Sequence, residues 1–115
     1  MNYTLSFIPD VEEDAVNGYR WYEEKAIGLG EEFLRIFYVV AGEISRNPLI
    51  YKEEYKDFRR CLLKRFPYAI YYRTEGTKVV VYALFHCARN PNVLQTNLRS
   101  REQKKREPGT PEDAG

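Results

Sequence analysis

With 115 residues, of which 43% are hydrophobic and 15% aromatic, the chain is long enough and apolar enough to fold as one domain around one core. Its formal net charge is only +1. No apolar run approaches the ~18–20 residues that a membrane-spanning helix needs, and no signal-peptide pattern opens the sequence. The two cysteines are too few for a disulfide scaffold, and no CxxC or paired-histidine spacing predicts a metal site. We therefore expect a cytoplasmic protein without a metal.

The first predicted element is a strand over residues 3–8, where apolar or aromatic side chains occupy alternate positions on one face. Pro9 then ends the strand. Asp10, followed three residues later by Glu13, predicts the N-cap and the capping box of a helix.

Two amphipathic helices follow, and the turn between them contains Gly28 and Gly30. Apolar side chains recur every three or four residues along one face of each helix. The second helix ends at Asn47-Pro48, because the residue before a proline avoids helical geometry. We predict an antiparallel helix hairpin over residues ~10–46. Its inward positions are Val11, Ala15, Tyr19, Tyr22 and Ala26 in the first helix, and Leu29, Phe33, Ile36, Phe37, Val40 and Ile44 in the second.

The second half of the chain is predicted to form three strands, at residues 58–65, 68–73 and 77–87. Phe66-Pro67 and Glu75-Gly76 separate them. Strands at such close spacing indicate a three-stranded antiparallel meander. Together with the N-terminal strand and the helix hairpin, this order predicts an α+β fold.

Alternation along RRCLLKRFPYAIYYR, residues 59–73, predicts that one face of the sheet supplies core residues and the other a row of cations. The predicted core residues are Cys61, Leu63, Ile70 and Tyr72. The predicted basic face consists of Arg60, Lys64 and Arg73.

The charges are unevenly distributed along the chain. Residues 1–56 hold six Lys/Arg and eleven Asp/Glu, giving −5, and residues 57–107 hold twelve and four, giving +8. The last eight residues add −2, and −5 + 8 − 2 recovers +1. The basic half indicates an acidic partner, either nucleic acid or an acidic protein segment. The alternative is that basic residues only solvate strand edges.

The end of the chain lacks the pattern of a folded element. From Arg99 onward, RSREQKKREPGTPEDAG shows no apolar periodicity. We predict one domain over residues 1–96 and a basic, disordered tail over residues 97–115.

Several coincident motifs carry a resemblance to a known family. RRCLLKRFPYAIYY contains the paired Arg59-Arg60, an FPY turn and an aromatic strand, and VVVYALFHCARNP ends in the pattern H-x-x-R-x-P. These motifs resemble the RelE/ParE superfamily of type II toxin–antitoxin toxins. The order strand–helix–helix–strand–strand–strand also matches, so the resemblance spans residues 2–94. The FPY turn and the H-x-x-R-x-P pattern favour the ParE-like branch.

The resemblance implies a small plasmid-stabilisation toxin that a cognate antitoxin holds inactive, as a homodimer or a toxin–antitoxin hetero-oligomer, without a cofactor. ParE-like members inhibit DNA gyrase, whereas RelE-like members cleave messenger RNA in the ribosome. A third alternative is a non-toxic protein with the same fold. As a binding protein, the chain would present five cations to its partner. These are Arg59, Arg60, Lys64, Arg65 and Arg89.

Chemistry helps to choose between the branches. Metal-free RNA cleavage needs an acid, a base and cations that stabilise the phosphorane. His86 is the only histidine, and NPNVLQTNLRSREQKK after Arg89 lacks the tyrosine or histidine that RelE-like enzymes place there. We therefore favour gyrase binding over enzymatic activity. A nuclease would use His86 as its acid or base, with Arg60, Lys64 and Arg89 holding the phosphate.

Overall fold

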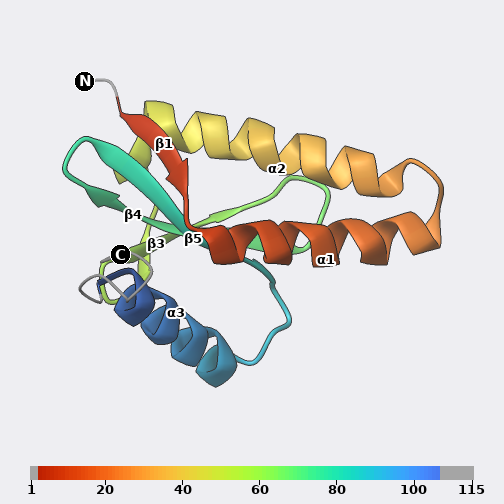
Figure 1. Ribbon diagram of the computed structural model, residues 1–115. Helices are drawn as coiled ribbons and strands as arrows, with labels where there is room; N and C mark the ends of the chain where they lie inside the picture. Colours follow the sequence, from red (N-terminus) through yellow and green to blue (C-terminus); the bar gives the residue numbers. More distant parts are fainter. Residues whose placement is uncertain (1–2, 107–115) are drawn as a thin grey trace, which may run out of the picture.

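The computed structural model describes residues 3–106 as a five-stranded sheet with three helices against it (Figure 1). The elements in chain order are β1 (Thr4–Phe7), α1 (Pro9–Lys25), α2 (Leu29–Arg46), the short 3-10 helix η1 (Pro48–Ile50), β2 (Glu53–Tyr55), β3 (Phe58–Leu62), β4 (Tyr68–Glu75), β5 (Lys78–His86) and α3 (Pro91–Arg106).

The strand order in the sheet is β1-β5-β4-β3-β2. Strands β3, β4 and β5 form the predicted antiparallel meander, and the predicted α+β class is confirmed. Strand β1 joins the sheet parallel to β5, from Thr4 opposite Lys78 to Phe7 opposite Val81. Strand β2 was not predicted, because its sequence EEY has no alternation of apolar residues.

The predicted helix hairpin is confirmed as α1 and α2, joined by residues 26–28. The predicted N-cap is wrong: α1 begins at Pro9, with Ile8 as the N-cap, and Asp10 lies inside the first turn. Proline suits the first helical position because its φ is already helical and its missing N–H would have no partner there. Before α2, Gly28 adopts a φ of 88°, a left-handed conformation that glycine accepts without strain.

The hairpin and one face of the sheet enclose an aromatic core. Phe33 of α2 is 0% exposed, and its ring centroid lies 4.8 Å from that of Tyr68, 5.2 Å from Tyr22 and 5.4 Å from Phe66. The four strand residues predicted to point inward are all buried: Cys61, Leu63, Ile70 and Tyr72. The prediction of a core face on these strands is therefore confirmed.

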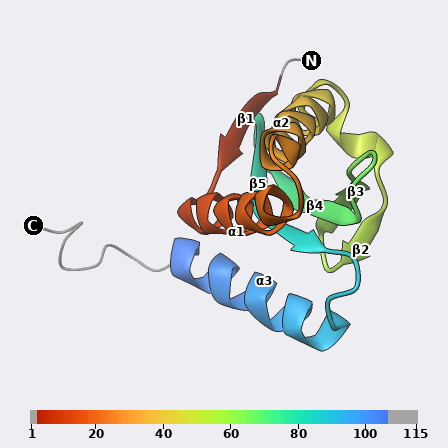
Figure 2. The same ribbon diagram turned by 90° about the vertical axis from the view of Figure 1, so that its right-hand side faces the viewer.

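Helix α3 corrects the predicted tail for residues 97–106, which are helical rather than disordered. Figures 1 and 2 show α3 on the side of the sheet away from α2. Leu98 is fully buried there, but the other inward positions include Arg101 and Glu102, which form ion pairs. An inward face built largely from charges leaves no apolar periodicity in the sequence. The remainder of the predicted tail, residues 107–115, lies outside the described residues.

Candidate functional site

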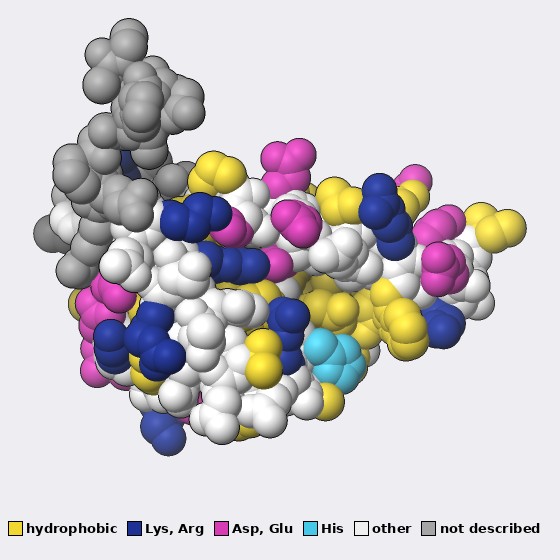
Figure 3. Space-filling model, turned by 60° about the horizontal axis from the view of Figure 1, so that its bottom comes forward, with side chains coloured by type: hydrophobic (Ala, Val, Ile, Leu, Met, Phe, Trp, Pro, Cys, Tyr) yellow, Lys and Arg dark blue, Asp and Glu magenta, His cyan; other side chains and the backbone are white. Residues whose placement is uncertain are grey.

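The predicted partner-binding cations on and beside β3 are engaged within the chain. Arg59 Nη1 donates to a backbone carbonyl oxygen at 2.6 Å, Lys64 Nζ lies 3.6 Å from Glu43, and Arg65 Nη1 lies 2.8 Å from Glu32. Both glutamates belong to α2. Figure 3, viewed from the α3 side, shows basic and acidic side chains next to one another on that face too. The acidic first half of the chain thus neutralises part of the basic second half.

Arg73, predicted on the basic face, is only 6% exposed. Its guanidinium carbon lies 5.1 Å from the ring centroid of Phe58 and 4.9 Å from that of Tyr82, and the side chain bonds to Glu75 at 2.9 Å and to Glu102 of α3. Burial would lower the pKa of Arg73, but the hydrogen bonds to Glu102 and Glu75 outweigh it and raise that pKa. Arg73 therefore anchors α3 instead of facing solvent.

Arg101 of α3 covers the part of β5 that extends beyond β1. Strand β1 pairs with β5 only as far as Val81. Further along, the Leu84 N–H donates to Asp14 of α1 at 3.0 Å, and Arg101 donates to the Tyr82 carbonyl oxygen at 2.8 Å. Arg101 also binds both carboxylate oxygens of Asp14, at 2.6 and 2.9 Å. Side chains of α1 and α3 thereby form hydrogen bonds with backbone groups of this strand edge, which would otherwise be free to pair with another chain.

The structure does not gather the predicted nuclease residues at one site. Arg60 lies opposite Tyr71 of β4, and His86 lies opposite Tyr68, an odd number of residues away on the same strand. Because successive residues of a strand point to opposite faces, Arg60 and His86 lie on opposite faces of the sheet. His86 and Arg89 border one hollow, and the other two predicted cations border another, along β3.

The hollow beside His86 has a volume of about 430 Å³ and lies where β5 ends, next to α1. Polar groups from three segments line it: Asp14 and Asn17 of α1, Tyr68 of β4, and His86 and Arg89 around the end of β5. Burial raises the pKa of Tyr68, while the nearby positive charge of Arg89 acts in the opposite direction. This phenol therefore stays protonated at neutral pH and can donate a hydrogen bond.

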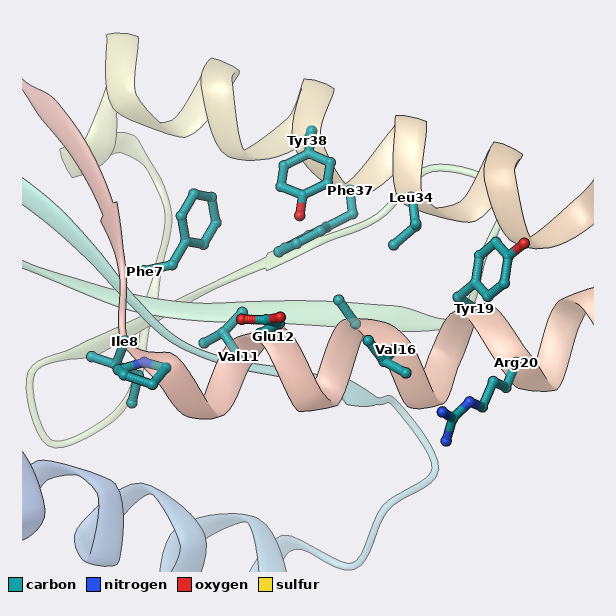
Figure 4. A pocket seen from close by; sticks show the side chains of 12 residues that line it. Phe7, Ile8, Val11, Glu12, Val16, Tyr19, Arg20, Leu34, Phe37 and Tyr38 are labelled. Carbon is teal, nitrogen blue, oxygen red and sulfur yellow. The ribbon is translucent and has the colours of Figure 1, made fainter.

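A larger hollow, the hairpin groove, has a volume of about 690 Å³ and lies along α1 and α2 (Figure 4). Figure 4 shows Phe37 and Tyr38 of α2 directed toward the side chains of α1, with Phe7 at one end. The lining is mostly apolar, and part of it is open to solvent: Val16 is 38% exposed and Tyr38 is 55% exposed. An exposed apolar groove of this kind is typical of a protein-binding surface.

Residues 5–91 match the sequence model of a family described as the ParE toxin of the type II toxin–antitoxin system parDE. The chain belongs to this family. Among curated relatives, Toxin ParE2 of Mycobacterium tuberculosis is 25% identical over 92 residues, which cover 79% of this chain and 88% of that toxin. The family match ends at the residue where α3 begins, so α3 follows the shared ParE region.

Solved structures of ParE and RelE systems share the fold of this ParE-family chain. A chain of the chromosomal ParDE system of P. aeruginosa gives a TM-score of 0.57 at 14% identity, covering 73% of this chain and 95% of that one. A chain of the RelBE2 toxin–antitoxin complex of M. tuberculosis gives a TM-score of 0.51 at 21% identity, covering 75% of this chain and 99% of that one. A free RelE mutant of E. coli gives 0.52 at 14% identity, covering 93% and 100%.

Sequence reasoning found the cations but missed both hollows. The groove residues Val16 and Tyr38 lie outside the predicted inward positions of the two helices, where a single apolar residue carries no signal. In the sequence, Asp14 and Asn17 cannot be distinguished from ordinary polar residues on the surface of a helix. Within residues 3–106, no helix is long and apolar enough to cross a membrane, and no group of three or more His, Cys, Asp or Glu could hold a metal ion.

Proposed function

We propose that this ParE-family toxin belongs to a plasmid-stabilisation module, that a cognate antitoxin neutralises it, and that it inhibits DNA gyrase by binding it in the cytoplasm. The family match over residues 5–91 supports the toxin role. The antitoxin is proposed because the similar structures include a ParDE system and a RelBE2 toxin–antitoxin complex. We propose a toxin–antitoxin hetero-oligomer as the resting state.

The observation that carries the antitoxin proposal is the hairpin groove. An amphipathic helix binds by laying apolar residues into such a groove, at a spacing of three or four residues. Exposed Val16 and Tyr38 supply apolar contacts along it, and Glu12 and Arg20 at its border can orient the incoming helix by charge. An antitoxin helix in the groove would remove both large apolar side chains from water.

The separation of the predicted nuclease residues supports protein binding rather than RNA cleavage. A phosphorane has to contact the acid, the base and the cations at the same time. Arg60 and His86 lie on opposite faces of the sheet, so one phosphate could not reach both.

The alternative is a ribosome-dependent mRNA endoribonuclease, or a non-toxic member of the fold. One observation favours the nuclease: His86, Tyr68 and Arg89 border the same hollow and could supply an acid, a base and a cation. In that case His86→Ala would slow cleavage by roughly 10²–10⁴-fold. For a gyrase inhibitor the same substitution removes no chemical step.

The deciding experiment is induction of the chain in growing cells, with DNA and protein synthesis followed by pulse labelling. A gyrase inhibitor should stop DNA synthesis first, and purified chain should inhibit supercoiling by gyrase in vitro. If protein synthesis stops first and ribosome-bound messenger RNA is cut, the endoribonuclease is correct. Undisturbed growth would identify a non-toxic member of the family.

The groove is tested with the proposed cognate antitoxin, sought as a short acidic protein encoded beside the toxin gene. Val16→Asp should weaken its binding strongly, because a charged carboxylate would face the apolar residues of the incoming helix. Ile27→Asp is the matched control, since Ile27 is 98% exposed at the tip of the hairpin and does not line the hairpin groove. If Val16→Asp folds normally and still binds the partner, the groove is not the antitoxin site.

A further inference from the structure

The hollow beside His86 and the hairpin groove lie on different sides of α1. Glu12, Val16 and Tyr19 border the groove, whereas Asp14 and Asn17 border the hollow. A helix seated in the groove therefore leaves the hollow accessible. Figure 3 shows the histidine side chain (cyan) at the molecular surface, with a basic side chain next to it.

The turn after β5 holds His86 in a defined orientation. The Ala88 N–H donates to His86 Nδ1 at 3.0 Å, and the Arg89 N–H donates to the His86 carbonyl oxygen at 3.0 Å. The Cys87 N–H fixes the same turn from the other side, by donating to the Pro67 carbonyl oxygen at 2.7 Å. Because Nδ1 is an acceptor, we assign the proton of the neutral ring to Nε2, which becomes a hydrogen-bond donor.

The side chains around the hollow supply mainly donors. The Tyr68 ring lies edge-on to His86, with 5.2 Å between the ring centroids, and Asn17 adds an exposed amide. Arg89 lies over the Phe85 ring, 4.4 Å from its centroid, and pairs with no carboxylate within residues 3–106. The nearby Asp14 is already bound by Arg101 and by the Leu84 N–H. The local excess is therefore one positive charge with neutral donors around it.

We infer that this hollow binds a single carboxylate, an Asp or Glu side chain of the protein that the toxin inhibits. Arg89 would form a charge-assisted hydrogen bond with it, and His86 Nε2 and the Tyr68 hydroxyl would donate to its remaining lone pairs. The buried Leu84 and Phe85 provide an apolar wall for the stem of that side chain. The inference rests on the proposed function, in that it assumes a protein target.

A carboxylate fits the hollow better than the backbone of a nucleic acid does. A phosphodiester strand needs several cations along its path, because affinity grows with the number of phosphates neutralised. Within the described residues, this hollow has one arginine without a carboxylate partner, so it lacks the row of cations that a nucleic-acid strand needs. One acidic side chain needs one arginine, which the hollow provides.

The test uses the full chain, isotope-labelled for NMR, and the capped tripeptide acetyl-Leu-Glu-Leu-amide as the probe. The peptide should shift the amide signals of Ala88 and Arg89, and its glutamine analogue should bind weaker by on the order of tenfold. Equal binding of the two peptides would overturn the inference. Tighter binding of a short oligouridylate than of the glutamate peptide would overturn it in favour of RNA.

Arg89→Gln should remove the preference for glutamate over glutamine. Arg99→Gln should keep it, because Arg99 is an exposed arginine on α3 that donates to Tyr55 at 3.1 Å and does not border the hollow. His86→Phe, which keeps an aromatic ring but removes the donor, should reduce the preference only partly. A glutamate preference that survives Arg89→Gln in a folded chain would overturn the assignment.

Growth assays separate this inference from the proposed function. If the wild-type chain does not arrest growth, the proposed function fails, and the assignment of a target carboxylate fails with it even where the tripeptide binds. If Arg89→Gln still binds the antitoxin and still arrests growth fully, the hollow is not the target site and the proposed function stands. We expect Arg89→Gln to bind the antitoxin normally and to lose most of its growth arrest.

Discussion

The two sides of the sheet are held by different forces. On one side, α2 packs through fully buried apolar residues such as Phe33, Phe37 and Ile44. On the other side, α3 contributes the buried Leu98 and attaches mainly through Arg101 and other charged groups. The stability gained from apolar burial is roughly proportional to the area buried and does not depend on pH. The stability gained from an ion pair depends on the ionisation of both partners and on the salt concentration.

This difference explains why we expect α2 to be held firmly, whereas the attachment of α3 depends on the charge state of a few residues. Removing one partner of a buried ion pair leaves a charge without compensation, so attachment by charge fails at single positions. Apolar packing is spread over many contacts and loses stability in proportion to the atoms removed. We therefore expect the hairpin side to set the global stability and the α3 side to respond to pH and to substitutions of single charged groups.

The largest effect is expected from Phe33→Ala on the hairpin side. Phe33 is 0% exposed and contacts three other aromatic rings, so its removal should lower the free energy of unfolding by about 3–5 kcal/mol. Ile27→Ala is the control, since Ile27 is 98% exposed and should change little. Chemical denaturation followed by circular dichroism measures both, and a loss within error for Phe33→Ala would refute this account of the core.

Arg101→Gln tests the α3 side. The Asp14 and Arg101 side chains are 9% and 13% exposed, so removing the cation should cost about 3 kcal/mol, at the lower end for a broken buried pair. Lys104→Gln on the same helix is the control, because Lys104 is 64% exposed in its pair with Asp10 and should contribute less than about 1 kcal/mol.

Hydrogen exchange distinguishes loosening of α3 from global unfolding. In Arg101→Gln, the α3 amides should exchange faster than those of α2, because α3 has lost its main anchor while the apolar core is intact. Equal acceleration in both helices would mean that α3 is part of one cooperative unit with the hairpin, and the division between the two sides would then be wrong.

The same difference explains what the sequence alone could predict. The hairpin and the meander were predictable because their buried faces repeat at helical or strand spacing, as Phe33, Ile36 and Val40 do on α2. Helix α3 was not, because its inward face continues from Leu98 to Arg101 and Glu102, and charges at buried positions look like a solvated surface.

The candidate site was predictable only in part. The cations could be listed from the sequence, but which of them pair internally depends on contacts between distant segments, such as Arg65 with Glu32. A register shift of one residue in β3 alone would also place Arg60 and His86 on the same face of the sheet. Only the structure shows that Arg73 is buried and that Arg89 shares a hollow with Tyr68.

Two glycine substitutions sharpen the description of the hairpin as tightly packed. A Cβ at Gly18 of α1 would lie 2.5 Å from the Phe33 ring, so Gly18→Ala should destabilise by about 1–3 kcal/mol. A Cβ at Gly42 of α2 would meet nothing within 4 Å, so Gly42→Ala should stabilise by about 0.5–1 kcal/mol through helix propensity. Thermal unfolding of both variants tests this. A change in stability of the same sign for both substitutions would contradict the close fit of the two helices.

A small effect that is specific to the α3 side concerns Glu75. Burial alone would raise its pKa, but hydrogen bonds from Lys105, Tyr82 and Arg73 outweigh burial and hold the pKa at about 2, below the usual 4.5. Because the folded-state pKa is the lower one, the stabilisation is fully present above pH 4.5. It is lost as pH falls toward 2, where the unfolded chain binds a proton that the folded chain does not.

Glu75→Gln should therefore reduce the free energy of unfolding at pH 6 by on the order of 1 kcal/mol, since the carboxylate is 29% exposed and partly screened. The difference from wild type should shrink steadily between pH 4.5 and about 2. Phe33→Ala provides the contrast, because the loss of apolar packing should be the same at every pH in that range. Parallel pH profiles for wild type and Glu75→Gln would show that the ion pairs of Glu75 with Arg73 and Lys105 add no stability.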